Sequence, residues 1–456
     1  MDRLSPQDAS FLYIENDVNH MHIATVALFE GPPPRDQQIE QMVASKLHLV
    51  PRYRQRVHFV PLEVGRPVWC DDPHFDLGYH VRHTALPSPG SDEQLRTLVG
   101  RVMSQQLDRS KPLWETWVVE GLEGNRWAML SKSHHCMVDG VAGTDLLGVI
   151  LDDRRDAVYD APRLFVPENP PSGYELLREA TRNNLTSPRE AVRAIRGALG
   201  RPRRLLKDLS QLGEGLATLR FSDERTESSL NGPIGPHRRW RQAKTTIADV
   251  KKIRQTYDGT INDVVLAAIT QGFRALLLAR GEEVAGRIVR SLVPVSVRRE
   301  GERGVYNNRV SAMFAELPVG IEEPIERLAA IHEQMQNLKE SHQAVAAETL
   351  TSLTGFAPPA LLALGARLFA GVEQHTVQTV TTNVPGPQRT LYAAGCRMIE
   401  AYPYVPLSGS VRIGIAIFSY VGQLTFGITC DAGTVKDVDI LARGIEEGVA
   451  DLLARC

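Results

Sequence analysis

The chain has 456 residues, of which 43% are hydrophobic and 23% are charged, a composition typical of globular proteins. A chain of this length exceeds what one hydrophobic core usually organises, so we expect two domains. The formal net charge of −2 provides no overall positive field for a polyanion and argues against nucleic acid as a partner.

The five cysteines are scattered along the chain, odd in number and without CxxC spacing. This arrangement predicts neither a disulfide framework nor a metal site, and it favours the reducing cytoplasm. The N-terminal residues lack the basic start and apolar run of a signal peptide. The most apolar helical stretch, residues 360–372, is interrupted by Arg367 and is shorter than the ~20 residues of a membrane span. We therefore expect a soluble or peripherally bound protein.

Residues 1–152 alternate strand and helix patterns and are predicted to form a first domain. Alternation of apolar and polar residues predicts a strand over 22–31, and helical spacing predicts helices over 36–50 and 91–108. The runs LWETWVVEGL and RWAMLSKS, joined by EGN, predict a β-hairpin. Its second strand leads directly into His134, so the histidines that follow stand at the rim of a sheet.

Residues 153–235 are rich in Arg, Pro, Ser and Asn and are interpreted as an inter-domain linker with helical pieces, the first over 174–184. Residues 236–456 return to mixed patterns and are predicted to form the second domain. The sequence thus indicates an α/β protein of two domains with a cleft between them. In the second domain we predict strands and a hairpin over 289–298, 308–317 and 411–431, and helices over 260–281, 324–340 and 436–456.

Residues 133–143 read SHHCMVDGVAG and place two histidines shortly before an Asp-Gly pair. Neighbouring side chains on a strand point to opposite faces, so His134 and His135 are not expected to bind one metal ion together. One of them is expected to face the core and the other a cleft. Past the strand end, Asp139 can hold the turn by bonding backbone amides or an arginine, and Gly140 leaves room for a substrate.

A histidine at such a rim suits a general base, because imidazole has an ordinary pKa of ~6.5 and is mostly unprotonated near neutrality. A base within reach of an alcohol contributes ~10²–10⁴-fold to a rate. A pair of packing histidines is the alternative, which the Asp-Gly pair at this spacing disfavours. Cys136 as a nucleophile is also disfavoured, because it and His135 are expected to point apart. The sequence contains no GxSxG elbow of a serine hydrolase.

The HHxxxDG pattern at 134–140 resembles that of the acyl-CoA-dependent acyltransferases related to chloramphenicol acetyltransferase, plant acyltransferases and peptide-synthetase condensation domains. Further segments make the chain similar, from end to end, to the bacterial wax ester synthase/diacylglycerol acyltransferase family. The resemblance implies an α/β fold of two chloramphenicol-acetyltransferase-like mixed-sheet domains, with the active site in a channel at their interface. The segments are LSPQDASFLYIEN (4–16), PLWETWVVEGL (112–122), LNGPIGPHRRW (230–240), INDVVLAAI (261–269), NNRVSAMFAELPV (307–319) and TTNVPGP (381–387).

The resemblance further implies transfer of a long-chain fatty acyl group from acyl-CoA to diacylglycerol, which gives triacylglycerol, or to a fatty alcohol, which gives a wax ester. Acyl-CoA is then a co-substrate, and neither a cofactor nor a metal is expected. By this resemblance His135 is the base that deprotonates the acceptor hydroxyl for direct attack on the thioester, and His134 supports it.

The rest of the motif is implied to be structural. Asp139 is expected to pair with an arginine of the second half, for which Arg309 and Arg412 are the candidates. Gly140 is expected to shape the channel.

Other residues are candidates for binding the substrates or the developing oxyanion. Asn262 is the first candidate oxyanion donor, with the N-cap of the following helix as its alternative role. The second candidates are Thr382 and Asn383. Three residues of the PLW sequence are expected either to line an acyl or alcohol passage or to pack in the strand core: Pro112, Leu113 and Trp114.

The segment 188–210 is basic and amphipathic. It is predicted to lie on an anionic membrane or lipid-droplet surface, to attract the phosphates of CoA, or to form a solvated face of the linker. Peripheral attachment of a cytoplasmic protein is the reading we favour. Two other functions stay open, namely a same-fold acyltransferase that uses another alcohol or a carrier-bound acyl donor, and a non-catalytic lipid-droplet-binding protein. The basic residues are Arg189, Arg193, Arg196, Arg201, Arg203, Arg204 and Lys207.

Overall fold

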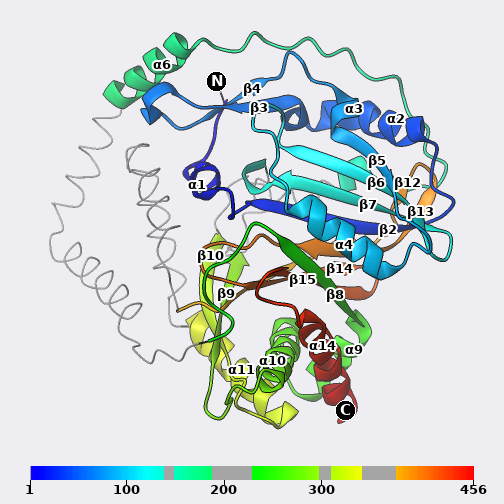
Figure 1. Ribbon diagram of the computed structural model, residues 1–456, viewed down its shortest axis with the longest axis vertical. Helices are drawn as coiled ribbons and strands as arrows, with labels where there is room; N and C mark the ends of the chain where they lie inside the picture. The colour runs from blue at the N-terminus through cyan, green and yellow to red at the C-terminus, as the bar shows by residue number, and fades with distance from the viewer. Residues whose placement is uncertain (1, 138–147, 187–227, 297–309, 341–375) are drawn as a thin grey trace.

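The computed structural model describes residues 2–137, 148–186, 228–296, 310–340 and 376–456 (Figure 1). Two six-stranded sheets dominate this part of the chain, together with a three-stranded sheet near the N-terminus. In Figure 1 the sheet of the N-terminal half lies above that of the C-terminal half, and the helices of the C-terminal half lie below their sheet. The chain is therefore a mixed α/β protein with two sheet-rich halves, as predicted.

The N-terminal sheet is built around the predicted hairpin, with the strand order β12-β13-β2-β7-β6-β5. Side chains alternate along β2, so the strand serves two cores. Ala27 and Phe29 pack in one cluster with residues of α2, and Val26 and Leu28 pack in another with residues of α4. The elements are β2 (His22–Glu30), β5 (Val81–Ala85), β6 (Trp114–Leu122), β7 (Arg126–His134), β12 (Tyr392–Ala393), β13 (Cys396–Tyr404), α2 (Asp36–Lys46), α3 (Leu77–His80) and α4 (Asp92–Met103).

Both predicted helices of this half exist but end earlier than expected. Ser91 and Gln94 form a capping box that starts α4, because each side chain accepts a hydrogen bond from the other residue's backbone N–H. The helix ends at Met103 rather than at residue 108. Similarly, α2 gives way after Lys46 to the 3-10 turns η1 (Leu47–Leu49) and η2 (Pro51–Arg54).

The small sheet has the order β1-β4-β3 and was not predicted, because its strands are short. It consists of β1 (Asp2–Arg3), β3 (Gln55–His58) and β4 (Val68–Asp71), and η3 (Pro61–Glu63) lies in the connection between β3 and β4. Directly after β1, Ser5 caps helix α1 by accepting a hydrogen bond from the Asp8 backbone N–H. Helix α1 (Pro6–Ile14) packs against the turn that follows β7.

The C-terminal sheet has the order β10-β9-β11-β14-β15-β8, and its main core lies between this sheet and four helices. The predicted hairpin, the two predicted strands and the three predicted helices are all confirmed. The strands are β8 (Arg238–Thr246), β9 (Val289–Ser296), β10 (Val310–Leu317), β11 (Thr379–Val384), β14 (Ile413–Tyr420) and β15 (Gln423–Asp431). The helices are α9 (Ile247–Thr256), α10 (Ile261–Ala279), α11 (Pro324–Glu340) and α14 (Val438–Leu453).

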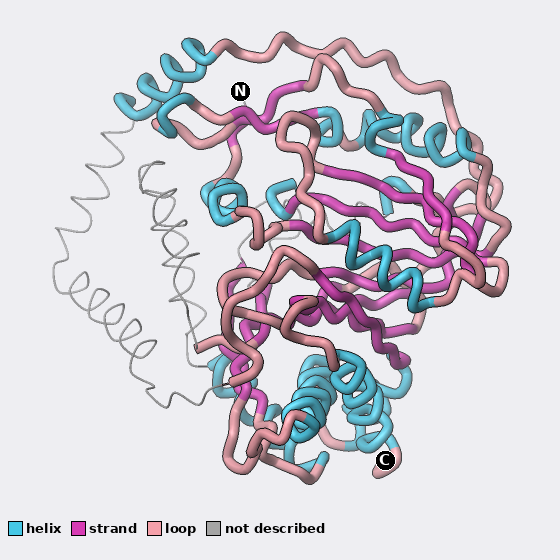
Figure 2. Tube along the Cα trace, viewed as in Figure 1, coloured by secondary structure: helices cyan, strands magenta, loops and turns pink. Residues whose placement is uncertain are grey.

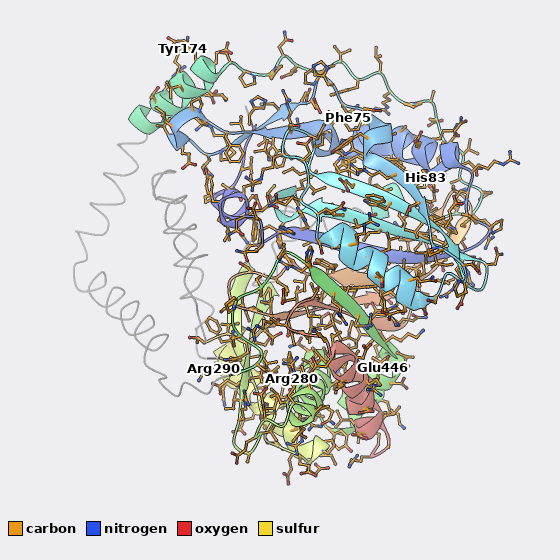
Figure 3. The ribbon with its side chains drawn as sticks, in the orientation of Figure 1. Phe75, His83, Tyr174, Arg280, Arg290 and Glu446 are labelled. Atoms are coloured by element: carbon orange, nitrogen blue, oxygen red, sulfur yellow. The ribbon has the colours of Figure 1, made fainter. Side chains whose placement is uncertain are left out.

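Helices α10 and α14 approach each other closely through glycines. A Cβ atom at Gly272 would lie 2.8 Å from the Leu441 carbonyl oxygen, and one at Gly444 would lie 2.9 Å from the Gly272 Cα. At the end of α10, Arg280, labelled in Figure 3, donates two hydrogen bonds to the Asp437 carboxylate at 2.6 and 2.7 Å. By length and composition α10 is apolar enough to cross a membrane, but 67% of that window is buried, as in a core helix of a soluble protein.

The two sheets are joined by a strand that leaves the C-terminal half. Strand β13 pairs with β2, so that Ala401 lies opposite Ala27. Strand β13 also contacts β15 of the C-terminal sheet, where Thr425 Oγ1 donates to the Ala401 carbonyl oxygen at 2.6 Å. A Cβ atom at Gly427 would lie 1.6 Å from the Pro403 carbonyl oxygen, so only glycine permits this approach. The sequence-based division at 1–152 and 236–456 did not foresee this exchange.

The described part of the predicted linker runs over the N-terminal half. Residues 153–172 contain no helix or strand, and Figure 2 shows them as an extended loop along the top of the view. Helix α6 (Gly173–Thr186) follows and matches the first helical piece predicted for the linker. The other predicted pieces, and the basic segment 188–210, lie outside the described residues.

Candidate active site

The backbone holds the double histidine from two sides. Strand β7 ends at His134, and the 3-10 turn η4 (His135–Met137) follows. The His134 N–H donates to the Leu113 carbonyl oxygen at 2.9 Å, and the His135 N–H donates to the Met21 carbonyl oxygen at 2.7 Å. The two imidazoles are therefore anchored at the end of the sheet, between the segments that precede β6 and β2.

The His134 side chain faces the interior and is 1% exposed. Its Nδ1 atom accepts a hydrogen bond from the Cys136 backbone N–H at 3.1 Å. Its Nε2 atom lies 3.6 Å from Oε2 of Glu15, and the ring meets His22 edge-on with 5.9 Å between centroids. His134 thus joins a buried polar cluster, which we define as Glu15, His22 and His134.

Glu15 is the anion of this cluster, and its side chain is 3% exposed. Burial opposes its ionisation, but the contacts with His134 and His22 outweigh burial and hold the pKa of Glu15 well below its usual range. His22 Nε2 lies 3.2 Å from Oε1, and Arg109 Nε donates to Oε2 at 2.9 Å. Burial lowers the pKa of His22 to about 3, so this ring is neutral near pH 7.

His135 has different surroundings from His134. Its ring is half-buried and stacks on Phe11 of α1, with 4.0 Å between centroids. Burial lowers the pKa of His135 to about 4, with a smaller contribution from His134, so the imidazole is unprotonated near neutrality. Its Nδ1 atom has no hydrogen-bond partner within the described part of the chain. A neutral imidazole keeps a lone pair on one of its two nitrogens, and this nitrogen is the one that can accept a proton.

The segment that anchors His135 also touches the C-terminal half. The Gly409 N–H donates to Asn19 Oδ1 at 3.2 Å, and the Arg238 guanidinium donates to the Val18 carbonyl oxygen. Both acceptors lie just before Met21, whose carbonyl oxygen binds the His135 N–H. The histidine pair therefore stands near the junction of the two halves.

Comparison with known proteins bears directly on this arrangement. The family model described as the wax ester synthase/diacylglycerol acyltransferase catalytic domain matches residues 4–265, and the model of the WS/DGAT C-terminal domain matches residues 306–452. The chain belongs to the wax ester synthase/diacylglycerol acyltransferase family. The resemblance seen in the sequence motifs is thereby confirmed, and the protein is an acyltransferase.

Individual members of the family support this assignment along the whole chain. A Mycobacterium tuberculosis H37Rv protein named "Probable diacyglycerol O-acyltransferase tgs1" is 39% identical over 100% of this chain and 96% of its own length. The structure of the wax ester synthase/diacylglycerol acyltransferase from Marinobacter aquaeolei VT8 superposes with a TM-score of 0.70 at 26% identity, over 99% of each chain. A trichothecene 15-O-acetyltransferase from Fusarium sporotrichioides shares the fold, with a TM-score of 0.64, 12% identity, and coverage of 99% and 94% of the two chains.

In this wax ester synthase/diacylglycerol acyltransferase family member, the PLW residues are explained by packing. Pro112, Leu113 and Trp114 are all buried. The Trp114 ring stacks on His80 at 4.5 Å and donates through Nε1 to the Tyr53 carbonyl oxygen at 2.8 Å. His80 in turn stacks on Phe75, which Figure 3 labels. Leu113 also supplies the carbonyl that anchors His134, so this segment positions the motif whether or not it touches substrate.

Asn262 does not cap α10. Thr260 is the N-cap, and its capping box closes with Asp263, whose carboxylate accepts from the Thr260 N–H at 2.8 Å. Asn262 is half-buried in the first turn of the helix, near its positive end. Its role as an oxyanion donor stays a prediction, but the alternative of a helix cap is wrong.

Thr382 and Asn383 lie on β11, opposite Ala416 and Ile417 of β14. Thr382 is half-buried and Asn383 is exposed. Within the described residues neither side chain forms a hydrogen bond with the histidine pair. Their oxyanion role stays a prediction.

Asp139, Gly140 and Arg309 lie outside the described residues. The other arginine candidate, Arg412, donates from Nη1 to the Ser229 carbonyl oxygen at 3.1 Å. Its guanidinium lies over Gly232, where a Cβ atom would be 2.4 Å from Nη2. Among described residues, no group of three or more His, Cys, Asp or Glu side chains is placed to hold a metal ion.

Sequence reasoning assigned no chemistry to Glu15, His22 or Phe11. Glu15 and Phe11 belong to the LSPQDASFLYIEN segment, which the family resemblance singled out without roles. The pair His20 and His22 at the start of β2 was the available signal, because buried polar side chains need partners.

Proposed function

We propose that this protein transfers a long-chain fatty acyl group from acyl-CoA to the free hydroxyl of diacylglycerol and so forms triacylglycerol. Fatty alcohols serve as secondary acceptors and give wax esters. The observation that carries the proposal is the neutral, half-buried imidazole of His135, anchored at the end of β7 within the catalytic-domain match. The names of the similar proteins support the same acceptors.

In the proposed reaction His135 acts as the general base. An unprotonated ring nitrogen takes the proton of the acceptor hydroxyl while the hydroxyl oxygen attacks the carbonyl carbon of the thioester. The tetrahedral intermediate collapses with cleavage of the C–S bond, and the imidazolium returns its proton to the departing CoA thiolate. Proton and electron pairs balance without an acyl-enzyme. A pKa of about 4 keeps the ring unprotonated across the physiological range, which is the state a general base needs before the transfer.

The substrates meet His135 near the junction of the two halves in this proposal, in the channel expected from the family resemblance. Asn262 is the proposed donor to the oxyanion, with Thr382 and Asn383 as second candidates. Support for Asn262 comes from the capping box, which Thr260 and Asp263 complete without it. The positive end of α10 adds favourable electrostatics for a developing negative charge.

An acceptor competition assay tests this function. Purified protein is supplied with labelled palmitoyl-CoA and equal amounts of diolein and hexadecanol, and the products are separated by chromatography. We expect triacylglycerol as the main product and wax ester as the minor one. Transfer to neither acceptor, together with transfer from an acyl carrier protein or to another alcohol, would contradict the proposed substrates.

We also propose that the protein is cytoplasmic and associates peripherally with a membrane or lipid droplet, because both acceptors reside there. The basic residues at 188–210 are the proposed contact. Changing Arg193, Arg196 and Arg203 to glutamate should abolish co-sedimentation with vesicles that contain anionic lipid. Unchanged binding of this triple variant would refute the role of the segment.

A further inference from the structure

The structure carries an inference that rests on the proposed role of His135. We propose that Glu15 is a positioning residue for the acyl transfer: its buried carboxylate fixes the tautomer of His134, and His134 in turn holds the turn that presents His135. Glu15 does not touch the substrate in this scheme. It acts through a close electrostatic contact with His134, the hydrogen bond from Cys136 to His134, and one turn of backbone.

Helix α1 contacts both histidines of the motif. Phe11 stacks on His135, and Glu15, directly after the last turn of α1, faces His134. The end of the helix is fixed, because the Glu15 N–H donates to the Phe11 carbonyl oxygen at 3.2 Å. One short helix therefore sets the environment of both rings, and its other end is capped by Ser5.

The hydrogen bond that the His134 ring accepts defines its tautomer. A backbone N–H can only donate, so Nδ1 of His134 must present its lone pair to the Cys136 N–H at 3.1 Å. The ring proton must then reside on Nε2. No described atom lies within hydrogen-bonding distance of Nε2, which is buried, and it faces the Glu15 carboxylate at 3.6 Å. A buried anion at this place stabilises the Nε2–H tautomer over the alternative.

The carboxylate is itself held in place. Arg109 donates to Oε2 of Glu15 from both Nε and Nη2, at 2.9 and 2.5 Å, and Nη2 also donates to the Leu12 carbonyl oxygen. His22 Nε2 approaches Oε1 at 3.2 Å. These contacts restrain the Glu15 carboxylate, including Oε2, the oxygen that faces His134. The negative charge therefore keeps a fixed position relative to the His134 ring.

The consequence for His135 follows from the turn. The bond from the Cys136 N–H to His134 Nδ1 links the end of β7 to η4, the turn in which His135 is the first residue. Without the carboxylate at position 15, the Nε2–H form of His134 loses its electrostatic stabilisation, so the Nδ1–H form, which opposes the Cys136 N–H, becomes more populated. The turn then loses this bond, and the His135 ring loses its fixed orientation toward the substrate hydroxyl.

The test uses the full-length protein and compares Glu15→Ala with Glu15→Gln. Glu15→Ala removes the acceptor and is expected to lower kcat about 10–100-fold with KM for palmitoyl-CoA changed less than about twofold. Glu15→Gln keeps an acceptor oxygen and should retain most of the activity. Asp152→Asn is the matched control, because it removes another buried carboxylate from an ion pair, with Lys46 at 2.6 Å, away from the histidines.

A second measurement has an outcome in the unaltered protein that can overturn the inference even where Glu15→Ala does not fold. In protein labelled with ¹³C-histidine, the ¹³Cδ2 shift of His134, assigned by its loss in His134→Gln, reports the tautomer. We expect Nε2–H in the unaltered protein and in Glu15→Gln, and a shift toward Nδ1–H in Glu15→Ala. An Nδ1–H tautomer in the unaltered protein would overturn the inference.

The inference also fails if Glu15→Ala loses no more activity than Asp152→Asn does. It fails equally if the activity of Glu15→Ala falls only in proportion to the fraction of protein that is unfolded. Failure of the proposed function would give a different set of activities. Full activity in His135→Ala would remove the proposed base itself, whereas an active Glu15→Ala beside an inactive His135→Ala would remove only the positioning role.

Discussion

The buried histidine His22 makes folding stability sensitive to acid. Burial lowers its pKa to about 3 in the folded protein, whereas the ordinary value in an unfolded chain is 6.5. Below pH 6.5 the unfolded chain binds a proton that the folded protein excludes, so the free energy of unfolding decreases as the pH falls. The loss continues until the pH reaches the folded pKa.

The size of the effect follows from these two values. A pH of 5 lies about 1.5 units below the pKa of histidine in the unfolded chain. At 1.36 kcal/mol per unit, the free energy of unfolding is therefore lower by about 2 kcal/mol at this pH. At pH 3 the contribution reaches about 5 kcal/mol. His135, whose pKa burial lowers to about 4, adds about 2 kcal/mol at pH 5 by the same reasoning.

Urea denaturation at pH 7 and pH 5, followed by circular dichroism, measures the effect. The unaltered protein should lose about 4 kcal/mol between these pH values from the two histidines, and His22→Asn should lose about 2 kcal/mol less. The exposed His74 supplies the control His74→Asn, which removes an imidazole that is not buried. A pH dependence of His22→Asn identical to that of the unaltered protein would refute the reasoning.

Three further substitutions probe other parts of the account. Asn262→Ala should lower kcat about 10²–10³-fold with an unchanged melting temperature, and a normal kcat would assign the oxyanion donor elsewhere. Trp114→Ala should lower the free energy of unfolding by about 3–5 kcal/mol in a denaturant titration, and a loss below 1 kcal/mol would contradict its packing between His80 and Tyr53. Gly427→Ala should prevent soluble expression, because the added methyl group collides with the Pro403 carbonyl oxygen. The control Gly78→Ala should express normally, and equal yields of the two variants would exclude the close contact between β15 and β13.

Local patterns predicted the helices and strands well where each element carries its own signals. The apolar spacing and the threonine cap of α10 lie within one stretch of sequence, as does the whole of α11. The helix ends of α2 and α4 were placed too late, because apolar residues such as Leu47 and Leu107 continue the spacing after the helix has stopped. These leucines are buried by packing against distant parts of the fold, which does not require them to lie in an α-helix.

The arrangements that join distant segments were not predictable in this way. Strand β13 was not predicted, and nothing in its residues indicates that its partner is β2, more than 350 residues earlier. The contact between Glu15 and His134 likewise depends on α1 lying against the turn after β7. The HHxxxDG motif could be recognised because its residues lie close together in the sequence. The Glu15 carboxylate, which we propose supports it, comes from another element.

The central claim is that the imidazole of His135 removes the proton from the acceptor hydroxyl. The most direct measurement is the single-turnover rate of acyl transfer from labelled palmitoyl-CoA to diolein in His135→Ala, beside His74→Ala and the unaltered protein. We expect a rate lower by about 10²–10⁴-fold in His135→Ala, with normal folding and normal acyl-CoA binding. A rate equal to that of His74→Ala would contradict the claim.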